Sequence, residues 1–201
     1  MLSCVALVCL AVAPAHAEGV VVALGDSLTA GLGVAADEAF PARLQARIRA
    51  EGYDYRVVNA GVTGDTTAGG LRRVDWALRA HPEVVIVALG ANDGLRGQSP
   101  AAIRANLEEI VARLQAAGAR VLLAGMRLPP NYGAEYTKEF EAVFPAVARR
   151  AKVPLMPFLL DGVAADSRLN QADGIHPTAA GQQIIADRVW PYLRPLLSPP
   201  K

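Results

Sequence analysis

Residues 19–33 read GVVVALGDSLTAGLG, and this stretch decides the fold. Residues 20–24 are apolar and mostly β-branched, which is typical of a short strand buried on both faces. Gly25 ends the run, because glycine tolerates the sharp turn that such a strand end requires. Asp26 and Ser27 follow at once. A serine at this point is held by the strand and exposed by the turn, so Ser27 is a candidate nucleophile, although a helix N-cap explains it equally well on its own.

Strand-like and helix-like segments alternate along the rest of the chain. The further apolar runs of strand length are residues 55–58, 84–89, 121–124 and part of 153–160. The segments with helical spacing are residues 40–50, 71–80, 100–117, 137–150 and a last one that begins near 178 and stops or kinks before Pro191. This alternation predicts an α/β fold in which a parallel sheet is covered by helices on both faces, a three-layer α/β/α sandwich. We expect one domain over residues 18–201.

The composition is that of a globular protein rather than a disordered one, because 52% of residues are hydrophobic and 19% are charged. The formal net charge is +1, and no run of Lys or Arg is present. The sequence therefore predicts neither a nucleic-acid partner nor a basic membrane-binding patch. We expect a monomer.

The N-terminus reads as a targeting segment. Residues 2–13 are almost wholly apolar but cover only about half of a membrane span, and small residues in an A-x-A pattern lead up to Ala17. We predict that residues 1–17 are a signal peptide cleaved after Ala17, which gives a periplasmic or secreted protein with no stable membrane anchor. Because no Lys or Arg precedes the apolar run, an uncleaved anchor or tail is the alternative. Cys4 and Cys9 both lie in this segment, so the mature chain would hold no thiol nucleophile and no thiolate metal site.

Two histidines remain in the mature chain. His81 follows a helix-like segment, where a histidine commonly bonds the last carbonyls. His176 has Asp173 three residues before it, Gly174 permits a bend between them, and Pro177 keeps His176 out of the helix that follows. This spacing lets the carboxylate accept a hydrogen bond from the imidazole Nδ1–H, although a simple salt bridge in a loop would give the same pattern.

Two more strand ends carry candidate residues. Asn92 lies between Gly90 and Gly94 after the third strand, where asparagine is usually a turn residue but could donate its side-chain N–H to an oxyanion. Gly61 follows the second strand and could donate its backbone N–H, because no side chain blocks the approach. The carboxyl ends of parallel strands meet at one edge of the sheet, so we expect these groups near Ser27. A nucleophile, a base, a carboxylate that orients the base and oxyanion donors are what acyl transfer requires.

The same four segments resemble the four conserved blocks of the SGNH hydrolase family. They are GDSL at residues 25–28, NAGVTGDT at 59–66, GAND at 90–93 and DGIH at 173–176. The resemblance covers nearly all of residues 20–196. It implies a flavodoxin-like fold that uses neither a metal nor an organic cofactor.

The resemblance also implies a role for each site residue. Ser27 is the nucleophile, His176 the base and Asp173 the residue that orients it. The backbone N–H groups of Ser27 and Gly61 and the side chain of Asn92 form the oxyanion hole. The predicted catalytic residues are thus spread over four separate segments of the chain.

The segment LPPNYG at residues 128–133 is similar to the multifunctional thioesterase and arylesterase members of that family. By resemblance, its Leu128, Pro130, Asn131 and Tyr132 bind substrate. We expect a serine esterase or thioesterase that acts on small-molecule esters with an apolar acyl or aryl group, such as aryl esters, acyl thioesters or lysophospholipids. A carbohydrate O-acetyl esterase of the same fold and a non-catalytic acyl- or glycan-binding relative are the alternatives.

Two other enzyme classes fit less well. Gly31, Gly33 and Ala36 match a dinucleotide-binding fingerprint, but that turn should follow the strand at once, and here several residues intervene. The nucleophile elbow of an α/β-hydrolase would need glycine at the position of Thr29.

Overall fold

The computed structural model describes residues 18–199, and the predicted signal peptide with its two cysteines lies outside these residues. A five-stranded sheet forms the centre. Its strands are β1 (Gly19–Gly25), β2 (Tyr55–Gly61), β3 (Val84–Ala88), β4 (Arg120–Ala124) and β5 (Leu155–Met156). They lie in the order β2-β1-β3-β4-β5, and every neighbouring pair is parallel, as the alternation of strands and helices predicted.

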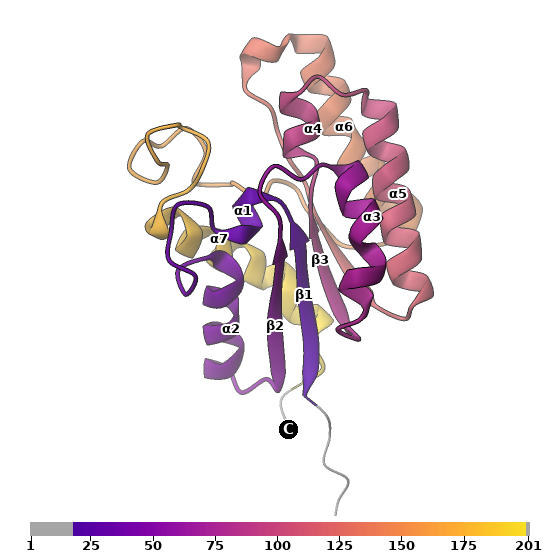
Figure 1. Cartoon of the computed structure of the whole chain (residues 1–201), viewed down its shortest axis with the longest axis vertical. Helices are drawn as coiled ribbons and strands as arrows, with labels where there is room; N and C mark the ends of the chain where they lie inside the picture. The colour runs from indigo at the N-terminus through magenta and orange to yellow at the C-terminus, as the bar shows by residue number, and fades with distance from the viewer. Residues whose placement is uncertain (1–17, 200–201) are drawn as a thin grey trace, which may run out of the picture.

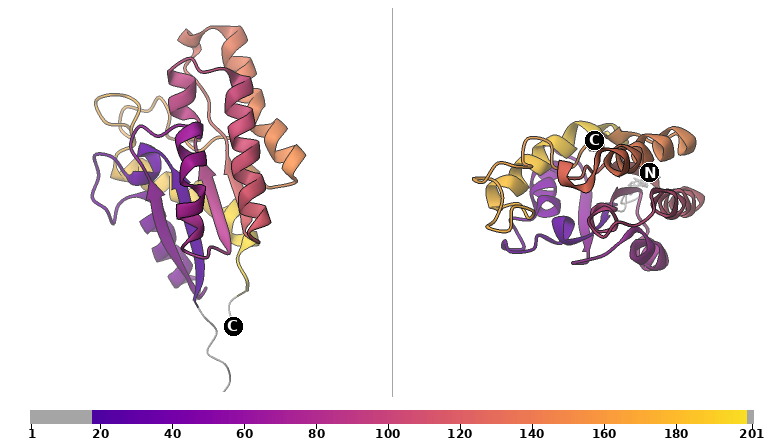
Figure 2. Two further views of the ribbon diagram at one scale, coloured as in Figure 1. Left: turned by 45° about the vertical axis from the view of Figure 1, so that its right-hand side comes forward. Right: turned by 90° about the horizontal axis from the view of Figure 1, so that it is seen from above.

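Helices cover both faces of the sheet. The longer ones are α2 (Phe40–Ala50), α3 (Thr67–Leu78), α5 (Pro100–Ala116), α6 (Ala134–Ala151) and α7 (Ala179–Leu193). Helices α2 and α7 pack together on one face, and α3, α5 and α6 pack side by side on the other (Figures 1 and 2). The predicted three-layer α/β/α sandwich is confirmed. No helix within residues 18–199 combines the length and the apolar character that a membrane span requires.

The core explains why the apolar runs fold as they do. Every residue of β1 and β3 is buried, because helices cover both faces of these central strands. On α5 the buried side chains recur at helical spacing and face the sheet: Ile103, Leu107, Ile110, Val111 and Leu114. Strand β2 is an edge strand in which only Tyr55 and Ala60 are buried, and its other residues are exposed or half-buried.

The carboxyl ends of three strands are in register. Gly25 of β1 pairs with Gly61 of β2 on one side and with Ala88 of β3 on the other. The segments that follow these strands therefore leave the sheet side by side, at the edge where parallel α/β folds bind their ligands.

Local differences from the predicted elements have local causes. Two short helices, α1 (Ser27–Ala30) and α4 (Ala91–Leu95), follow β1 and β3 where the sequence suggested loops, because helices this short show no apolar periodicity. Helix α3 starts at Thr67 because the side chain of Thr66 accepts a hydrogen bond from the Gly69 N–H. Helix α7 continues through Pro191 to Leu193 instead of stopping before the proline.

Candidate active site

Ser27 is the first residue of α1, directly after the end of β1. Asp26 caps this helix, since its Oδ1 accepts a hydrogen bond of 2.9 Å from the Leu28 N–H. Gly25 leaves no room for a side chain: a Cβ there would lie 2.0 Å from Thr29 Oγ1 and 2.9 Å from the Ala88 carbonyl oxygen. As the first residue of a helix, Ser27 has a backbone N–H with no acceptor inside the helix.

His176 lies beside Ser27 and is held by Asp173. The Ser27 Oγ is 2.9 Å from His176 Nε2, and His176 Nδ1 is 2.6 Å from Asp173 Oδ2. Asp173 Oδ1 also accepts the backbone N–H groups of Ile175 and His176, at 2.9 and 3.0 Å. The bend between them is made by Gly174, whose φ of 71° lies in the left-handed region that glycine adopts freely. The structure thus joins in one chain of hydrogen bonds three residues that are up to 149 positions apart.

Hydrogen-bond donors set the charge state of Asp173. The backbone N–H of His176, then its imidazole, then the backbone N–H of Ile175 lower the pKa of this carboxyl well below its ordinary value. Asp173 is therefore ionised near neutral pH. An ionised acceptor at Nδ1 leaves Nε2 to accept a proton from Ser27.

Two glutamines hold the histidine loop against the serine helix. Gln171 donates its amide to the carbonyl oxygens of Leu32, at 2.7 Å, and of Pro177, at 2.9 Å. Gln182, fully buried in α7, donates to the Leu28 carbonyl at 3.1 Å and accepts from the Phe40 N–H at 2.8 Å. The distance between Ser27 and His176 therefore depends on contacts made on either side of both residues.

Asn92 lies in α4, the short helix that follows β3. Its side-chain Nδ2 donates to the Asp65 carbonyl at 2.9 Å and approaches Asp26 Oδ2 at 3.3 Å. These two contacts fix the plane of the amide close to the residue that precedes Ser27. Both N–H groups of this amide have acceptors, so Asn92 must release the longer contact, with Asp26, to present an N–H to an oxyanion formed at Ser27.

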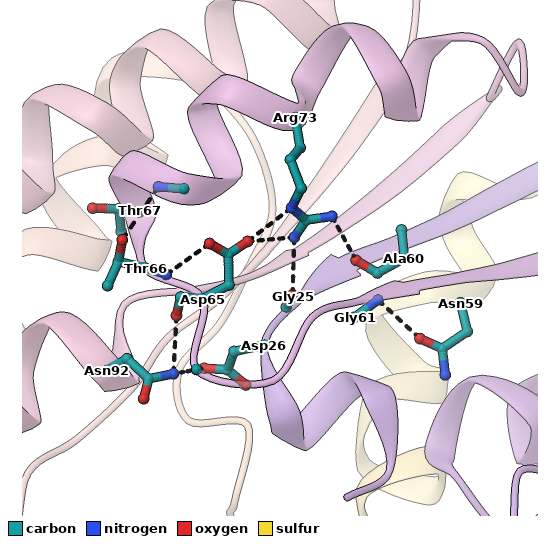
Figure 3. A network of polar contacts seen from close by, with 12 residues as sticks. Gly25, Asp26, Asn59, Ala60, Gly61, Asp65, Thr66, Thr67, Arg73 and Asn92 are labelled. Atoms are coloured by element: carbon teal, nitrogen blue, oxygen red, sulfur yellow. Dashed lines mark hydrogen bonds and ion pairs between the residues drawn. The ribbon is translucent and has the colours of Figure 1, made fainter.

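Gly61 is less suited to the role of oxyanion donor that the sequence suggested. Its N–H already donates to Asn59 Oδ1 at 2.9 Å, and Figure 3 shows it beside Asn59, with Asp65 lying between it and Asn92. A Cβ at Gly61 would lie 2.2 Å from the Ala30 backbone nitrogen, so this glycine is needed for the close packing of β2 against α1. The geometry gives Gly61 a packing role, and its role as an oxyanion donor stays a prediction.

Gly64, in the same loop, is a further candidate donor that the residue pattern does not single out. Its φ is 78°, it directly precedes Asp65, and its carbonyl accepts a hydrogen bond of 3.1 Å from Arg96. Within residues 18–199 its N–H makes no backbone hydrogen bond. A Cβ at Gly64 would meet only Arg96, at 3.6 Å, so packing does not explain this glycine. The available signal was its position at the loop tip, two residues before the helix cap Thr66.

Asp26 is a buried carboxyl next to the candidate nucleophile, and 1% of its surface is exposed. Burial raises the pKa of Asp26 from 3.8 to about 6, although the Leu28 N–H and His176 act in the opposite direction. Its environment is thus the reverse of that of Asp173, with too few donors to offset the loss of water.

The four residues predicted to bind substrate lie in a segment that packs against α4. Leu128 is buried in the core, and the Tyr132 hydroxyl donates to the Leu95 carbonyl at 3.3 Å. Pro130 and Asn131, in the short 3-10 helix Pro130–Tyr132, are exposed. Their substrate contacts stay a prediction, while Leu128 already has a packing role. Within residues 18–199 no group of three or more His, Cys, Asp or Glu side chains is arranged to hold a metal ion.

Comparison with known proteins agrees with this geometry. The model of the GDSL-like Lipase/Acylhydrolase family matches residues 23–184. The chain is 48% identical over 195 residues to Esterase TesA of Pseudomonas aeruginosa, covering 96% of each protein. It is 40% identical over 185 residues to Thioesterase 1/protease 1/lysophospholipase L1 of Escherichia coli K12, covering 92% of this chain and 88% of that protein. A crystal structure of TesA superposes with a TM-score of 0.86 at 47% identity, covering 89% of this chain and 99% of that one.

Proposed function

The chain belongs to the GDSL-like lipase/acylhydrolase family of ester-hydrolysing enzymes, and from this premise we propose that Ser27, His176 and Asp173 are its catalytic triad. The observation that carries the proposal is the continuous contact from Ser27 Oγ to His176 Nε2 and from His176 Nδ1 to Asp173. A nucleophile, a base and an orienting carboxylate in this relation are the requirement for acyl transfer by serine.

The positions of these atoms support the following reaction. His176 Nε2 takes the proton from Ser27 Oγ as that oxygen attacks the acyl carbonyl. Asp173 holds the other ring nitrogen and stabilises the imidazolium that forms. The imidazolium then gives its proton to the leaving alcohol or thiol. Water, activated by the same imidazole, hydrolyses the acyl-enzyme and releases the acid.

For the oxyanion hole we propose the Ser27 N–H, the Asn92 side chain and the Gly64 N–H in place of Gly61. Asn92 and the Gly64–Asp65 peptide are neighbours, because Asn92 Nδ2 donates to the Asp65 carbonyl. The Gly61 N–H, in contrast, would have to leave Asn59 before it could stabilise an oxyanion. Asn92 would have to release only the longer of its two contacts, the 3.3 Å approach to Asp26, and a smaller reorganisation costs less transition-state stabilisation.

The proposed substrates are small esters and thioesters with an apolar acyl or aryl group. The relatives named as an esterase and as a thioesterase and lysophospholipase support this class. We further propose export to the periplasm or the medium after cleavage following Ala17. Export would separate the enzyme from cytoplasmic acyl-CoA, so oxygen esters are the proposed physiological substrates.

A fluorophosphonate probe tests the nucleophile. We expect the wild-type protein to be labelled on Ser27 and the S27A variant to be unlabelled, with an unchanged thermal unfolding midpoint. Folded wild-type protein that does not react would instead favour the non-catalytic relative.

A substrate panel tests the specificity. It should contain p-nitrophenyl esters of increasing chain length, acyl-CoAs, a lysophospholipid and acetylated sugars. We expect kcat/KM to be highest for an ester with an apolar acyl chain. A preference for acetylated sugars would overturn this assignment and favour the carbohydrate esterase.

A further inference from the structure

Arg73 makes the densest set of polar contacts behind the proposed active site. It projects from α3 toward the carboxyl ends of the sheet, where its guanidinium lies against three separate segments (Figure 3). Its Nε donates to Asp65 Oδ2 at 2.9 Å, Nη1 to the Ala60 carbonyl at 3.1 Å, and Nη2 to the Gly25 carbonyl at 3.2 Å. The guanidinium and the carboxylate are largely buried, with 22% and 10% of their side-chain surfaces exposed.

Two of these segments, at Gly25 and at Asp65, lead directly to groups of the proposed oxyanion hole. The Gly25 carbonyl belongs to the strand end that continues into Ser27. Asp65 directly follows Gly64, and its own carbonyl accepts the Asn92 side chain. One guanidinium therefore contacts the supports of all three proposed donors.

The Asp65 carboxylate has little freedom to move. Its Oδ2 is bound by Arg73, and its Oδ1 accepts the Thr66 N–H at 3.0 Å. A Cβ at Gly69 would lie 1.7 Å from Asp65 Oδ1, so α3 leaves room for the carboxylate only because residue 69 is glycine. With its side chain fixed on both oxygens, Asp65 has a fixed backbone, and the direction of its carbonyl determines the direction of Asn92.

We propose that Arg73 is a positioning residue that sets the oxyanion hole by orienting Asn92 through Asp65, an inference that rests on the proposed function. A buried ion pair adds little net stability, because the cost of desolvation offsets much of the attraction between the charges. A planar guanidinium with donors in a rigid fork does, however, fix the relative position of the groups that it binds. Arg73 therefore acts on the transition state and leaves ground-state binding of the ester unchanged.

A second arginine that pairs with α3 offers a matched control. Arg113 of α5 pairs with Asp75 of α3, and Asp75 is 76% exposed. This pair joins two helices away from the strand ends. An R113K substitution therefore repeats the chemistry of R73K without touching the segments that carry Ser27 and Asn92.

The test is a double-mutant cycle between Arg73 and Asn92. Lysine retains the charge but cannot reach all three acceptors, so R73K should lower kcat by about 10- to 100-fold with KM within about twofold. A boronic acid that forms a tetrahedral adduct on Ser27 should lose affinity by a similar factor. N92A should lower kcat by about 10²- to 10³-fold. In the N92A background, R73K should lower kcat by less than about threefold, because Asn92, through which Arg73 acts, is absent. R113K should leave kcat unchanged.

An equal loss of kcat from R73K in both backgrounds would overturn the proposal, as would a lower thermal midpoint with unchanged kcat. If R73K does not fold, D65N in the same cycle supplies the second test, because it breaks the same contact from the other side. Fluorophosphonate labelling of wild-type Ser27 separates the two proposals: absence of labelling refutes the proposed function, whereas labelling together with an additive cycle refutes only the role of Arg73.

Discussion

Asp173 and His176 lie three residues apart in one loop, whereas the groups on the opposite side of Ser27 come from three segments. On the histidine side, one carboxylate accepts two backbone N–H groups and the imidazole, all within three residues of itself. On the oxyanion side, Arg73 reaches 8 residues back to Asp65 and 48 back to Gly25. The contacts of Asp173 depend only on the conformation of its own loop. The contacts of Arg73 depend on the packing of α3 against the sheet.

The two sides also shift the pKa of a carboxyl group in opposite directions. Asp173 is half exposed and rich in donors, so the pKa of its carboxyl falls. Asp26 is buried with one backbone donor, so the pKa of its carboxyl rises to about 6. One carboxylate is therefore stabilised as an anion by its surroundings, and the other is held as an anion at a cost to the fold.

The largest effect in this comparison is expected from D173N. Asparagine keeps an oxygen for the N–H groups of residues 175 and 176, but its amide cannot both hold Nδ1–H and stabilise an imidazolium. We expect kcat for a p-nitrophenyl ester to fall by about 10²- to 10⁴-fold, with KM and the thermal midpoint nearly unchanged. A loss below about tenfold would show that Asp173 only closes its loop.

The histidine side could be predicted from sequence because its contacts join residues that are close together in the chain. A carboxylate, a glycine and a histidine within four residues, followed by a proline, specify the bend and the contact together. The same holds for the fold, because the apolar runs of β1 and β3 and the apolar stripe of α5 are visible within each segment. The predicted helix 40–50 matches α2.

The oxyanion side could be predicted only as far as its strand ends. The loop after β2 holds two glycines, and what separates Gly61 from Gly64 is the contact of one with Asn59 and α1 and the proximity of the other to Asn92. These are tertiary contacts, which leave no pattern in the loop itself. The Arg73 network was missed for the same reason, because an arginine within a helical stretch is usually a solvated residue.

A pair of alanine substitutions separates the two glycines. G61A places a methyl group against the Ala30 backbone, so we expect a thermal midpoint lowered by several degrees, or failure to fold. G64A meets no close neighbour, but its φ of 78° costs alanine about 1–2 kcal/mol and shifts the loop. We expect G64A to lower kcat by about tenfold or more with a smaller change in the midpoint.

Kinetics and thermal unfolding of both variants check this prediction. A G61A protein with the wild-type midpoint and a reduced kcat would restore Gly61 as the oxyanion donor. Normal kcat in G64A would remove Gly64 from the site.

The smallest expected effect is on stability and comes from D26N. The folded protein binds the Asp26 proton more tightly than the unfolded chain does, so this carboxyl contributes stability below pH 3.8 that is lost as the pH rises through about 6. Asparagine caps a helix as well as aspartate does and carries no charge to desolvate. The variant should therefore be more stable than wild type by about 1–3 kcal/mol above pH 6, and the difference should shrink toward pH 4.

Denaturant unfolding at several pH values measures this difference, and steady-state kinetics measure what the charge contributes. We expect kcat of D26N to fall, because the new amide would present an N–H, rather than an acceptor, to Asn92. A variant that is more stable and less active would show that the enzyme retains a destabilising carboxylate because Asn92 needs it. A stability difference independent of pH would mean instead that the pKa of Asp26 is the same in the folded protein as in the unfolded chain, so that burial does not raise it.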